Sequence, residues 1–290
     1  MIKKIMMFGF IMTVALSLSG AAYAKEGGQS IQIKGSDTMV NLGQAWAEEF
    51  MAAHPEVSIA ITGGGSGTGI AALINGTTNI ATTSRQIKGK ELEDAKRNGY
   101  YPEEFKVGID ALAVIVNPAN PVSELTFDQL SGIFTGKITN WKEVGGKDQK
   151  ILVLSRDRNS GTHLYFLEQV VRKGNEKGPE QFAPSTLMLS SSEAIIAETS
   201  QSDSAIGYDG LGYVSPKVKT VAVAKKSGEA FVRPSKEAAM NRTYPICRYL
   251  YMYTGFKPKG EVKTFLDFVL SEQGQKIVET MDFVPLPKKE

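Results

Sequence analysis

The sequence predicts an α/β protein built from two lobes. Short β-rich runs alternate with amphipathic stretches from residue 31 onward, and this alternation is typical of α/β folds. A chain of this length can bury two cores, since single cores stop growing near about 250 to 300 residues. Two continuous apolar runs, 111–116 and 248–254, indicate strands buried on both faces. We therefore expect one lobe from residues 25–113 and 247–290 and a second lobe from residues 114–246, hinged to close on a ligand.

The individual elements follow from the spacing of apolar residues. Helical spacing joins Met39, Leu42, Trp46 and Phe50, and a second strong stripe predicts one long helix near the C-terminus. Strands are expected at 31–34, 57–62, 80–83, 111–116, 151–154, 205–208 and 248–254. Helices are expected at 39–53, 69–75, 88–98, 162–172, 192–199 and 261–280.

The N-terminal segment has the features of a secretory signal peptide. Two lysines precede an apolar run from Ile5 to about Leu18, and a small-x-small cleavage site ends at Ala24. The run is shorter than the ~20 residues that span a bilayer, so we expect cleavage after Ala24. A lipid anchor would need a cysteine at the cleavage point, and the single cysteine is Cys247. The mature chain is therefore predicted to be free in the periplasm, as a monomer.

Composition excludes several classes of partner. The leader carries two lysines and no acids, so the 33 basic residues of the full chain fall to about 31, against 31 acidic ones. A formally neutral chain has no broad basic surface for nucleic acid or anionic lipid. One cysteine and two histidines do not suggest a disulfide framework, a zinc site or another cofactor. Any bound anion must be held by local groups.

Three predicted strands each run into a Gly/Ser/Thr turn that opens a helix. The turns are Gly35 to Thr38, Gly63 to Gly69, and Asn159 to Thr162. Such turns offer unpaired N–H groups, the positive end of a helix dipole and hydroxyl donors to an anion. One turn alone is an ordinary helix cap. Three of them in one chain indicate an oxyanion site.

The glycine-rich turn does not match a nucleotide-binding fingerprint. Thr68 stands where the dinucleotide pattern requires glycine, and no Gly-Lys-Ser/Thr occurs in the chain. Two further positions point to a small oxyanion instead. Arg156 leaves the strand 151–154 four residues before Ser160, where its guanidinium could form a bidentate pair with an anion. Ser84 and Arg85 follow the strand 80–83, and open α/β sheets bind ligands at such strand ends.

Six motifs in this order resemble the periplasmic phosphate-binding proteins of Pst-type ABC importers, in their shorter branch. They are Gly35-Ser-Asp-Thr-Met39, Gly63 to Gly69, Thr83-Ser-Arg85, Phe134 to Trp141, Ser155 to Thr162, and Ala205-Ile-Gly-Tyr208. The resemblance implies a type II periplasmic binding protein fold, two α/β lobes joined by two hinge strands. It also implies a non-enzymatic protein that delivers phosphate to a membrane permease. Carried over by position, the phosphate ligands would be Ser36, Thr38, Ser66, Ser84, Arg156, Ser160, Gly161 and Thr162.

One position departs from the long branch of that family. A carboxylate follows the serine there, whereas this chain has Arg85. Phosphate keeps a proton at neutral pH and sulfate does not, so a buried acceptor distinguishes the two anions. Asp37 is our candidate acceptor, with Asp157 as the second, although Asp37 could equally cap a helix. Arg85 either binds the anion directly or is a charge at the rim of the site.

Three alternative functions remain open from the sequence. Another tetrahedral oxyanion, such as sulfate, molybdate or tungstate, would use the same helix N-termini. A hydrolase could use Ser160 as nucleophile and His163 as base, but no Gly-x-Ser-x-Gly elbow is present and His163 is expected on a helix surface. A sensing or adhesive role would keep the same site. Tyr208 and Tyr213 are expected in the core or at the rim, and Trp141 is expected to pack inside the second lobe.

Overall fold

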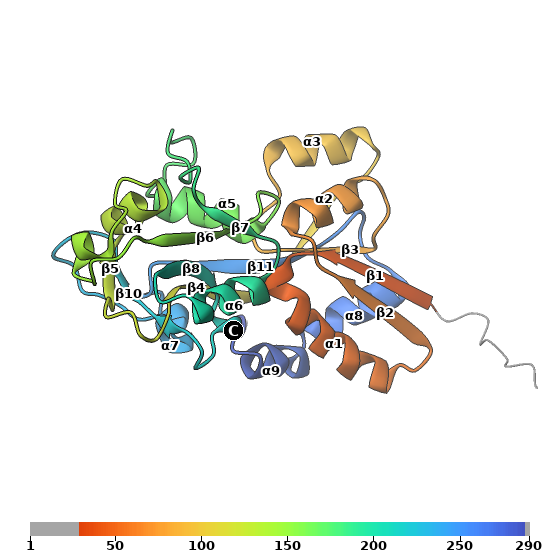
Figure 1. The fold of residues 1–290 in the computed structure, drawn as a ribbon. Helices are drawn as coiled ribbons and strands as arrows, with labels where there is room; N and C mark the ends of the chain where they lie inside the picture. The colour runs from red at the N-terminus through yellow and green to blue at the C-terminus, as the bar shows by residue number, and fades with distance from the viewer. Residues whose placement is uncertain (1–28, 288–290) are drawn as a thin grey trace, which may run out of the picture.

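One long mixed β-sheet organises the computed structural model, which describes residues 29–287 (Figure 1). The predicted signal peptide and its cleavage site lie outside these residues. The strands follow one another across the sheet in the order β2-β1-β3-β11-β4-β8-β6-β7. Their bounds are β1 Gln29–Gly35, β2 Val57–Thr62, β3 Ile80–Thr83, β4 Glu103–Val116, β6 Leu152–Arg156, β7 Leu187–Leu189, β8 Ala205–Gly210 and β11 Cys247–Thr254.

The two central strands run against their neighbours. β1 pairs in parallel with β2 and β3, and β6 pairs in parallel with β7 and β8. β11 is antiparallel to β3 and β4, and β4 is antiparallel to β8 and to the short β9 (Lys219–Thr220). β4 pairs with β11 over residues 103–111 and with β8 over 112–116. This strand therefore passes from one half of the sheet to the other.

Helices cover both faces of the half formed by β1, β2 and β3 (Figure 1). On one face, α1 (Val40–Ala53) buries Leu42, Trp46 and Phe50 against the C-terminal helices, and the Trp46 indole N–H donates to the carbonyl of Gly274 at 2.8 Å. On the other face lie α2 (Ser66–Ile74) and α3 (Gly89–Arg97). The prediction of a single helix over residues 261–280 is wrong. The segment is divided into α8 (Gly260–Leu270) and α9 (Glu272–Thr280) at extended Ser271, whose side chain caps α9.

The other half of the sheet has its own apolar core. It contains residues of β4, β6 and β8 together with α4 (Phe127–Phe134), α5 (Gly161–Phe166) and α7 (Lys236–Met240). α5 continues as a π-helical segment, Leu167–Val171, and α6 (Ser192–Gln201) packs on the opposite face. A small parallel pair, β5 (Glu124–Thr126) and β10 (Ala222–Ala224), borders this core. The predicted packing of Trp141 is confirmed, since it is 1% exposed and donates to the carbonyl of Ser204.

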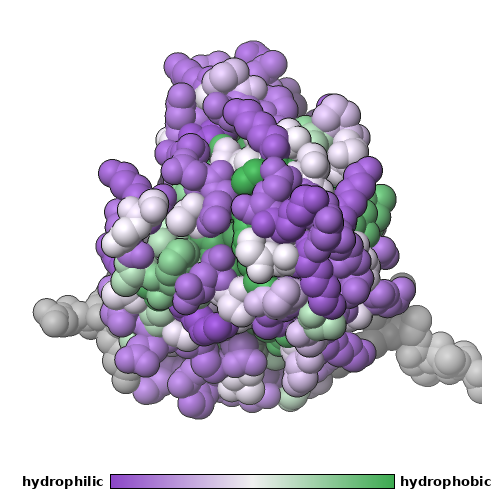
Figure 2. Space-filling model, turned by 60° about the vertical axis from the view of Figure 1, so that its left-hand side comes forward, coloured by the Kyte–Doolittle hydropathy of each residue, from purple (hydrophilic) through white to green (hydrophobic). Residues whose placement is uncertain are grey.

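The remaining helical segments are short 3-10 turns at Asp37–Met39, Trp141–Val144 and Leu211–Tyr213. Figure 2 shows that one face of the molecule is largely hydrophilic, with smaller hydrophobic areas between the polar side chains. Within residues 29–287, every helix is too short or too polar to span a bilayer.

Candidate functional site

The three turns predicted from the sequence meet in the structure. The second turn needs glycine, because Gly64 and Gly65 have φ values of 108° and 91°, which other residues rarely adopt. The Gly67 N–H donates to the carbonyl of Asn159 in the third turn at 2.9 Å. The Asn159 side-chain amide donates to the carbonyl of Gly64 at 2.6 Å. The turns after β2 and β6 are therefore joined by hydrogen bonds in both directions.

Four hydroxyls gather where the turns meet. The Thr38 and Thr162 hydroxyl oxygens are 2.9 Å apart, and those of Ser66 and Ser84 are 3.3 Å apart. The Ser84 N–H also donates to the Ser66 hydroxyl at 3.0 Å. A Cβ added at Gly161 would lie 2.4 Å from the Ser66 oxygen and 2.6 Å from the Ser84 oxygen, so both serines face the start of α5. All four hydroxyl side chains are buried.

Arg156 lies at the end of β6 with no exposed surface and is surrounded by acceptors. Its Nη2 donates to Asp37 at 2.8 Å and to the carbonyl of Ser190 at 3.1 Å. Its Nη1 donates to the Ser192 hydroxyl at 2.9 Å and lies 3.4 Å from Asp209. Its Nε is buried and has no hydrogen-bond partner among the described residues. Arg156 at the end of β6 is thus joined to the first turn, the end of β8 and the start of α6.

Asp209 is a fully buried carboxylate at the end of β8. It accepts hydrogen bonds from the Ser192 hydroxyl at 2.9 Å and from the Gly210 N–H at 2.7 Å. Burial raises the pKa of Asp209 above its ordinary value, and the nearby Arg156 guanidinium offsets part of this rise. The carboxylate is therefore held in place chiefly by its hydrogen bonds to Ser192, Gly210 and Arg156.

Asp37 is the first residue of its short 3-10 helix, whose N-cap is Ser36, and its carboxylate accepts from groups outside that helix. One carboxylate oxygen accepts from the Gly64 N–H at 2.8 Å and the other accepts from Arg156 at 2.8 Å. Tyr213 donates to the backbone carbonyl of Asp37 at 2.7 Å, which places this tyrosine beside the first turn. Asp37 therefore links the first turn to the second turn and to Arg156 at the end of β6. Asp157, the second candidate acceptor, is bound through its main chain to another strand, since its backbone N–H donates to the carbonyl of Leu189 on β7.

Ser36 and Ser160, the other two predicted serine ligands, contact backbone groups of neighbouring elements. The Ser36 backbone N–H donates to Thr82 on β3 at 2.9 Å, and its side chain is 2% exposed. The Ser160 hydroxyl caps α5 by accepting from the N–H groups of Thr162 at 3.2 Å and His163 at 3.4 Å. Both serines lie within the joined turns.

The Arg85 guanidinium is hydrogen-bonded to Glu91 and to the Gln86 carbonyl, and to none of the other predicted ligands in the described part of the chain. Its guanidinium pairs bidentately with Glu91 at 2.7 and 2.8 Å, at the first turn of α3. Burial alone would raise the pKa of Glu91, but hydrogen bonds from Arg85 and the Lys88 N–H bring it below its ordinary value. Lys88 in turn contacts Glu168 at 2.8 Å, on the π-helical segment. Arg85 thus makes a bidentate pair with a single carboxylate six residues away, whereas Arg156 is shared among several acceptors.

The expectation of a surface-exposed His163 is wrong. Its ring is 7% exposed, packs on Phe182 and places Nδ1 3.1 Å from the Ser155 hydroxyl, which also contacts Tyr208. Burial lowers the pKa of His163 to about 4. Its ring makes no hydrogen bond to the Ser160 hydroxyl, which accepts two backbone N–H groups instead. This arrangement does not provide a nucleophile and base pair at Ser160.

Comparison with known proteins identifies the family. A PBP superfamily domain matches residues 21–273. The phosphate-binding protein PstS of Pseudomonas aeruginosa is 36% identical and is matched over 92% of this chain and 87% of that protein. PstS of Bacillus subtilis is 34% identical, over 89% of this chain and 81% of that protein. The chain belongs to the PstS family of the PBP superfamily.

Solved structures of phosphate transport proteins share the fold. A phosphate ABC transporter substrate-binding protein of Clostridium perfringens, described with bound phosphate, has a TM-score of 0.79 at 35% identity, over 89% of this chain and all of that one. A phosphate transport receptor of Vibrio cholerae has a TM-score of 0.69 at 32% identity, over 89% of this chain and all of that one. The predicted α/β class and type II periplasmic binding protein fold are confirmed.

Four charged or polar residues at this PstS-family site escaped the sequence analysis: Asp110, Ser192, Asp209 and Arg248. Arg248 and Asp110 form a buried ion pair at 2.8 Å, and Arg248 also donates to the Thr162 hydroxyl at 2.8 Å. One signal could have found this pair. Asp110 interrupts an otherwise apolar run, and Arg248 opens another, and a charge in a fully buried strand needs a partner.

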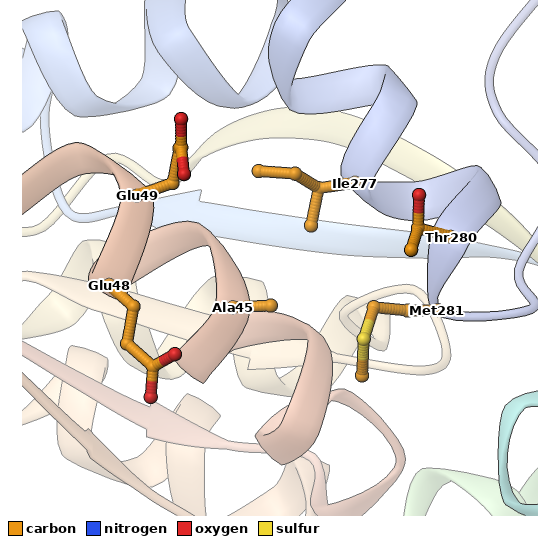
Figure 3. A pocket seen from close by; sticks show the side chains of 6 residues that line it. All are labelled: Ala45, Glu48, Glu49, Ile277, Thr280 and Met281. Carbon is orange, nitrogen blue, oxygen red and sulfur yellow. The ribbon is translucent and has the colours of Figure 1, made fainter.

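A separate groove of about 340 Å³ lies between α1 and α9 (Figure 3). Its lining carries the carboxylates of Glu48 and Glu49 and the hydroxyl of Thr280, with Ala45, Ile277 and Met281. It has no arginine or lysine, so it is poorly suited to an anion. Across residues 29–287, no group of three or more His, Cys, Asp or Glu side chains could hold a metal ion.

Proposed function

We propose that this chain is a periplasmic solute-binding protein that captures inorganic phosphate and delivers it to the membrane permease of an ABC importer. PstS-family membership supports this role, since the relatives in Pseudomonas aeruginosa and Bacillus subtilis are named phosphate-binding proteins. The protein carries out no chemical step in this proposal. It acts as a monomer, with the signal peptide removed after Ala24 and no cofactor.

The observation that carries the proposal is the convergence of three turns on buried hydroxyls and Arg156. Hydroxyls and the N–H groups of first helical turns donate to an oxyanion without needing a net charge on the protein. Arg156 adds a charge-assisted donor in a buried setting, where such bonds are strongest. We assign the phosphate ligands to Ser36, Asp37, Thr38, Ser66, Ser84, Arg156, Ser160, Gly161 and Thr162.

Asp37 is the group that we assign to selecting phosphate over sulfate. Its oxygens accept from Gly64 and Arg156, and each carboxylate oxygen has a second acceptor position. A protonated phosphate oxygen can donate to such a position, whereas sulfate has no proton to donate and is repelled. Arg85 is withdrawn from our ligand set, because its guanidinium is paired with Glu91.

We also propose that the two halves of the sheet are the lobes that hold the anion. One lobe comprises residues 25–113 and 247–290, and the other comprises residues 114–246. Separate apolar cores on the two sides support this division. The bond from Gly67 to Asn159 and the contact between Thr38 and Thr162 both connect the two lobes. β4 and β11 serve as the hinge strands.

Calorimetric titration with phosphate, sulfate and molybdate tests the proposed function. We expect tight binding of phosphate with one anion per chain and binding of sulfate at least about 100-fold weaker, about 2.7 kcal/mol. Protein purified without refolding should also carry phosphate, which a colorimetric assay of the denatured sample would detect. Equal affinity for sulfate would assign the site to tetrahedral oxyanions generally. Hydrolysis of phosphoesters that disappears in Ser160→Ala would overturn the assignment as a binding protein.

A further inference from the structure

A buried ion pair lies beside the four hydroxyls of the site, on the two central strands. Arg248 of β11 and Asp110 of β4 are direct partners in the antiparallel ladder. The Arg248 Nε and Nη2 both donate to one Asp110 oxygen, at 3.1 and 2.8 Å. Their side chains are 2% and 0% exposed. The aspartate therefore fixes the guanidinium at the boundary between the two halves of the sheet.

The same guanidinium reaches across to both halves of the site. Its Nη2 donates to the Thr162 hydroxyl at 2.8 Å and lies 3.4 Å from the Thr38 hydroxyl. Those two hydroxyls are 2.9 Å from each other, so the three groups form a closed triangle. Thr38 belongs to the turn after β1 and Thr162 to the helix after β6. Arg248 is thus the one side chain in the described part of the molecule that is hydrogen-bonded to both threonines.

The triangle determines which way the threonine hydroxyls point. A guanidinium only donates, so Arg248 occupies an acceptor position on the Thr162 oxygen. The two threonines together have two hydroxyl protons, and one of them closes the bond between the two oxygens. The other proton remains to be donated to a further acceptor. A charged donor behind the pair therefore leaves one of the two hydroxyl protons for the anion.

Two buried polar atoms of the ion pair have no hydrogen-bond partner among the described residues. They are the Arg248 Nη1 and the second oxygen, Oδ1, of Asp110. Leaving a charged donor buried and unpaired is costly, and a purely structural ion pair would normally satisfy such atoms. These two unsatisfied atoms therefore weigh against a purely structural role for the pair.

We propose that Arg248 is a positioning residue of the anion site, held by Asp110, which orients the hydroxyls of Thr38 and Thr162 so that one of their two protons is donated to phosphate. This inference rests on the proposed phosphate function. It predicts that the contribution of Arg248 to affinity passes through the threonine hydroxyls. A pair that merely joined β4 to β11 would affect affinity equally whether or not the hydroxyl were present.

A double-mutant cycle separates these two roles. The double substitution Arg248→Gln with Asp110→Asn neutralises both partners, and Thr162→Val removes the hydroxyl while preserving shape. Phosphate dissociation constants are measured by equilibrium dialysis with radiolabelled phosphate up to millimolar concentrations. We expect the neutral pair to weaken binding at least about tenfold in the wild-type background and less than about threefold in the Thr162→Val background. Equal losses in both backgrounds, or unchanged affinity, would overturn the proposal.

A matched control comes from an exposed Arg–Asp pair. Arg97 pairs with Asp94 on the surface of α3, and neither side chain is hydrogen-bonded to Thr38 or Thr162. Arg97→Gln with Asp94→Asn makes the same chemical change, and we expect phosphate affinity to stay within about twofold. If the buried neutral pair does not fold, as judged by circular dichroism, the cycle is repeated with Arg248→Lys. Lysine keeps the charge, so a loss of about threefold that disappears with Thr162→Val supports the proposal, and an equal loss contradicts it.

The wild-type protein distinguishes failure of this inference from failure of the proposed function. Wild-type protein that does not bind phosphate contradicts the proposed function itself. Wild-type protein that binds phosphate, together with an Arg248 variant of equal affinity, contradicts only the positioning role.

Discussion

Two arginines at strand ends have similar sequence contexts and different surroundings. Arg156 ends β6 and Arg85 follows β3, and both lie close to serines of the site. Arg156 is shared among Asp37, Ser192 and Asp209, with one nitrogen left without a partner. Arg85 is paired bidentately with the single carboxylate of Glu91.

The difference lies in how many acceptors each guanidinium has and where they come from. The partner of Arg85 is six residues away, so its pair belongs to the local structure of α3. The partners of Arg156 come from elements 34 to 119 residues away, so its pairing depends on the assembled site. An arginine satisfied by a local carboxylate has little left for an anion. An arginine held by distant, partly shared acceptors can change its pairing when an anion arrives.

The largest expected effect is on the Arg156 side of this comparison. Arg156→Gln removes a buried charge-assisted donor and should weaken phosphate binding about 100-fold, about 2.7 kcal/mol. Arg85→Gln removes the same group from the other strand end and should change affinity less than about threefold. Calorimetric titration of both variants with phosphate measures the two effects. Similar losses in the two variants would remove the distinction drawn between these arginines.

A steric change should have the next largest effect. A Cβ at Gly161 would lie within 2.6 Å of both site serines, whereas a Cβ at Gly89, beside Arg85 and Glu91, would have nothing within 4 Å. Gly161→Ala should therefore weaken phosphate binding at least about tenfold, about 1.4 kcal/mol. Gly89→Ala should leave affinity unchanged and serves as the control. Retention of full affinity by Gly161→Ala, measured by the same titration, would contradict the placement of Ser66 and Ser84.

The smallest expected effect is a pH dependence of stability on the Arg156 side. The pKa of His163 is lowered by burial to about 4 in the folded protein, from about 6.5 unfolded. As the pH falls, the unfolded chain therefore binds the proton before the folded chain does. The contribution of neutral His163 to the free energy of unfolding is complete above about pH 6.5 and falls as the pH drops toward 4. Between pH 7.5 and pH 6 the free energy of unfolding should fall by about 1 kcal/mol through His163.

Urea unfolding in buffer without phosphate, at pH 7.5 and pH 6, measures the difference. In the His163→Gln variant, the free energy of unfolding should fall less between pH 7.5 and pH 6 than in the wild type. The pKa of Glu91, the partner of Arg85, is lowered, so Glu91 affects the free energy of unfolding only at pH values below this window. A wild-type slope that persists undiminished in His163→Gln would show that another group titrates.

Much of the fold could be predicted from local sequence, and the errors have physical reasons. β4 begins at Glu103, eight residues before the predicted strand, because backbone hydrogen bonds to β11 pair residues whose side chains are charged. The apolar stripe from Val262 to Leu270 predicts one long helix near the C-terminus, whereas the structure has two helices there. The break at Ser271 depends on an extended residue that caps α9, a local feature that the spacing of apolar residues does not report.

The site was predictable where its chemistry is local to a turn. Glycine and hydroxyl residues in sequence identify each turn, and the structure brings all three together. Arg248, Asp110 and Asp209 could not be placed, because their contacts depend on the register and order of strands. The burial of His163 depends on Phe182, which lies 19 residues further along the chain and packs on its ring. Sequence patterns report which face of an element is apolar but not which distant side chain covers it.

The hydrogen bond from the Gly67 N–H to the Asn159 carbonyl has a consequence for how this protein can diverge. Both of its atoms belong to the main chain, so substitutions at these positions leave the donor and the acceptor in place, with proline at 67 as the exception. Genetic drift can therefore exchange neighbouring side chains, and with them the affinity, while the two turns remain joined. Directed evolution toward other oxyanions would begin from a framework that tolerates those changes.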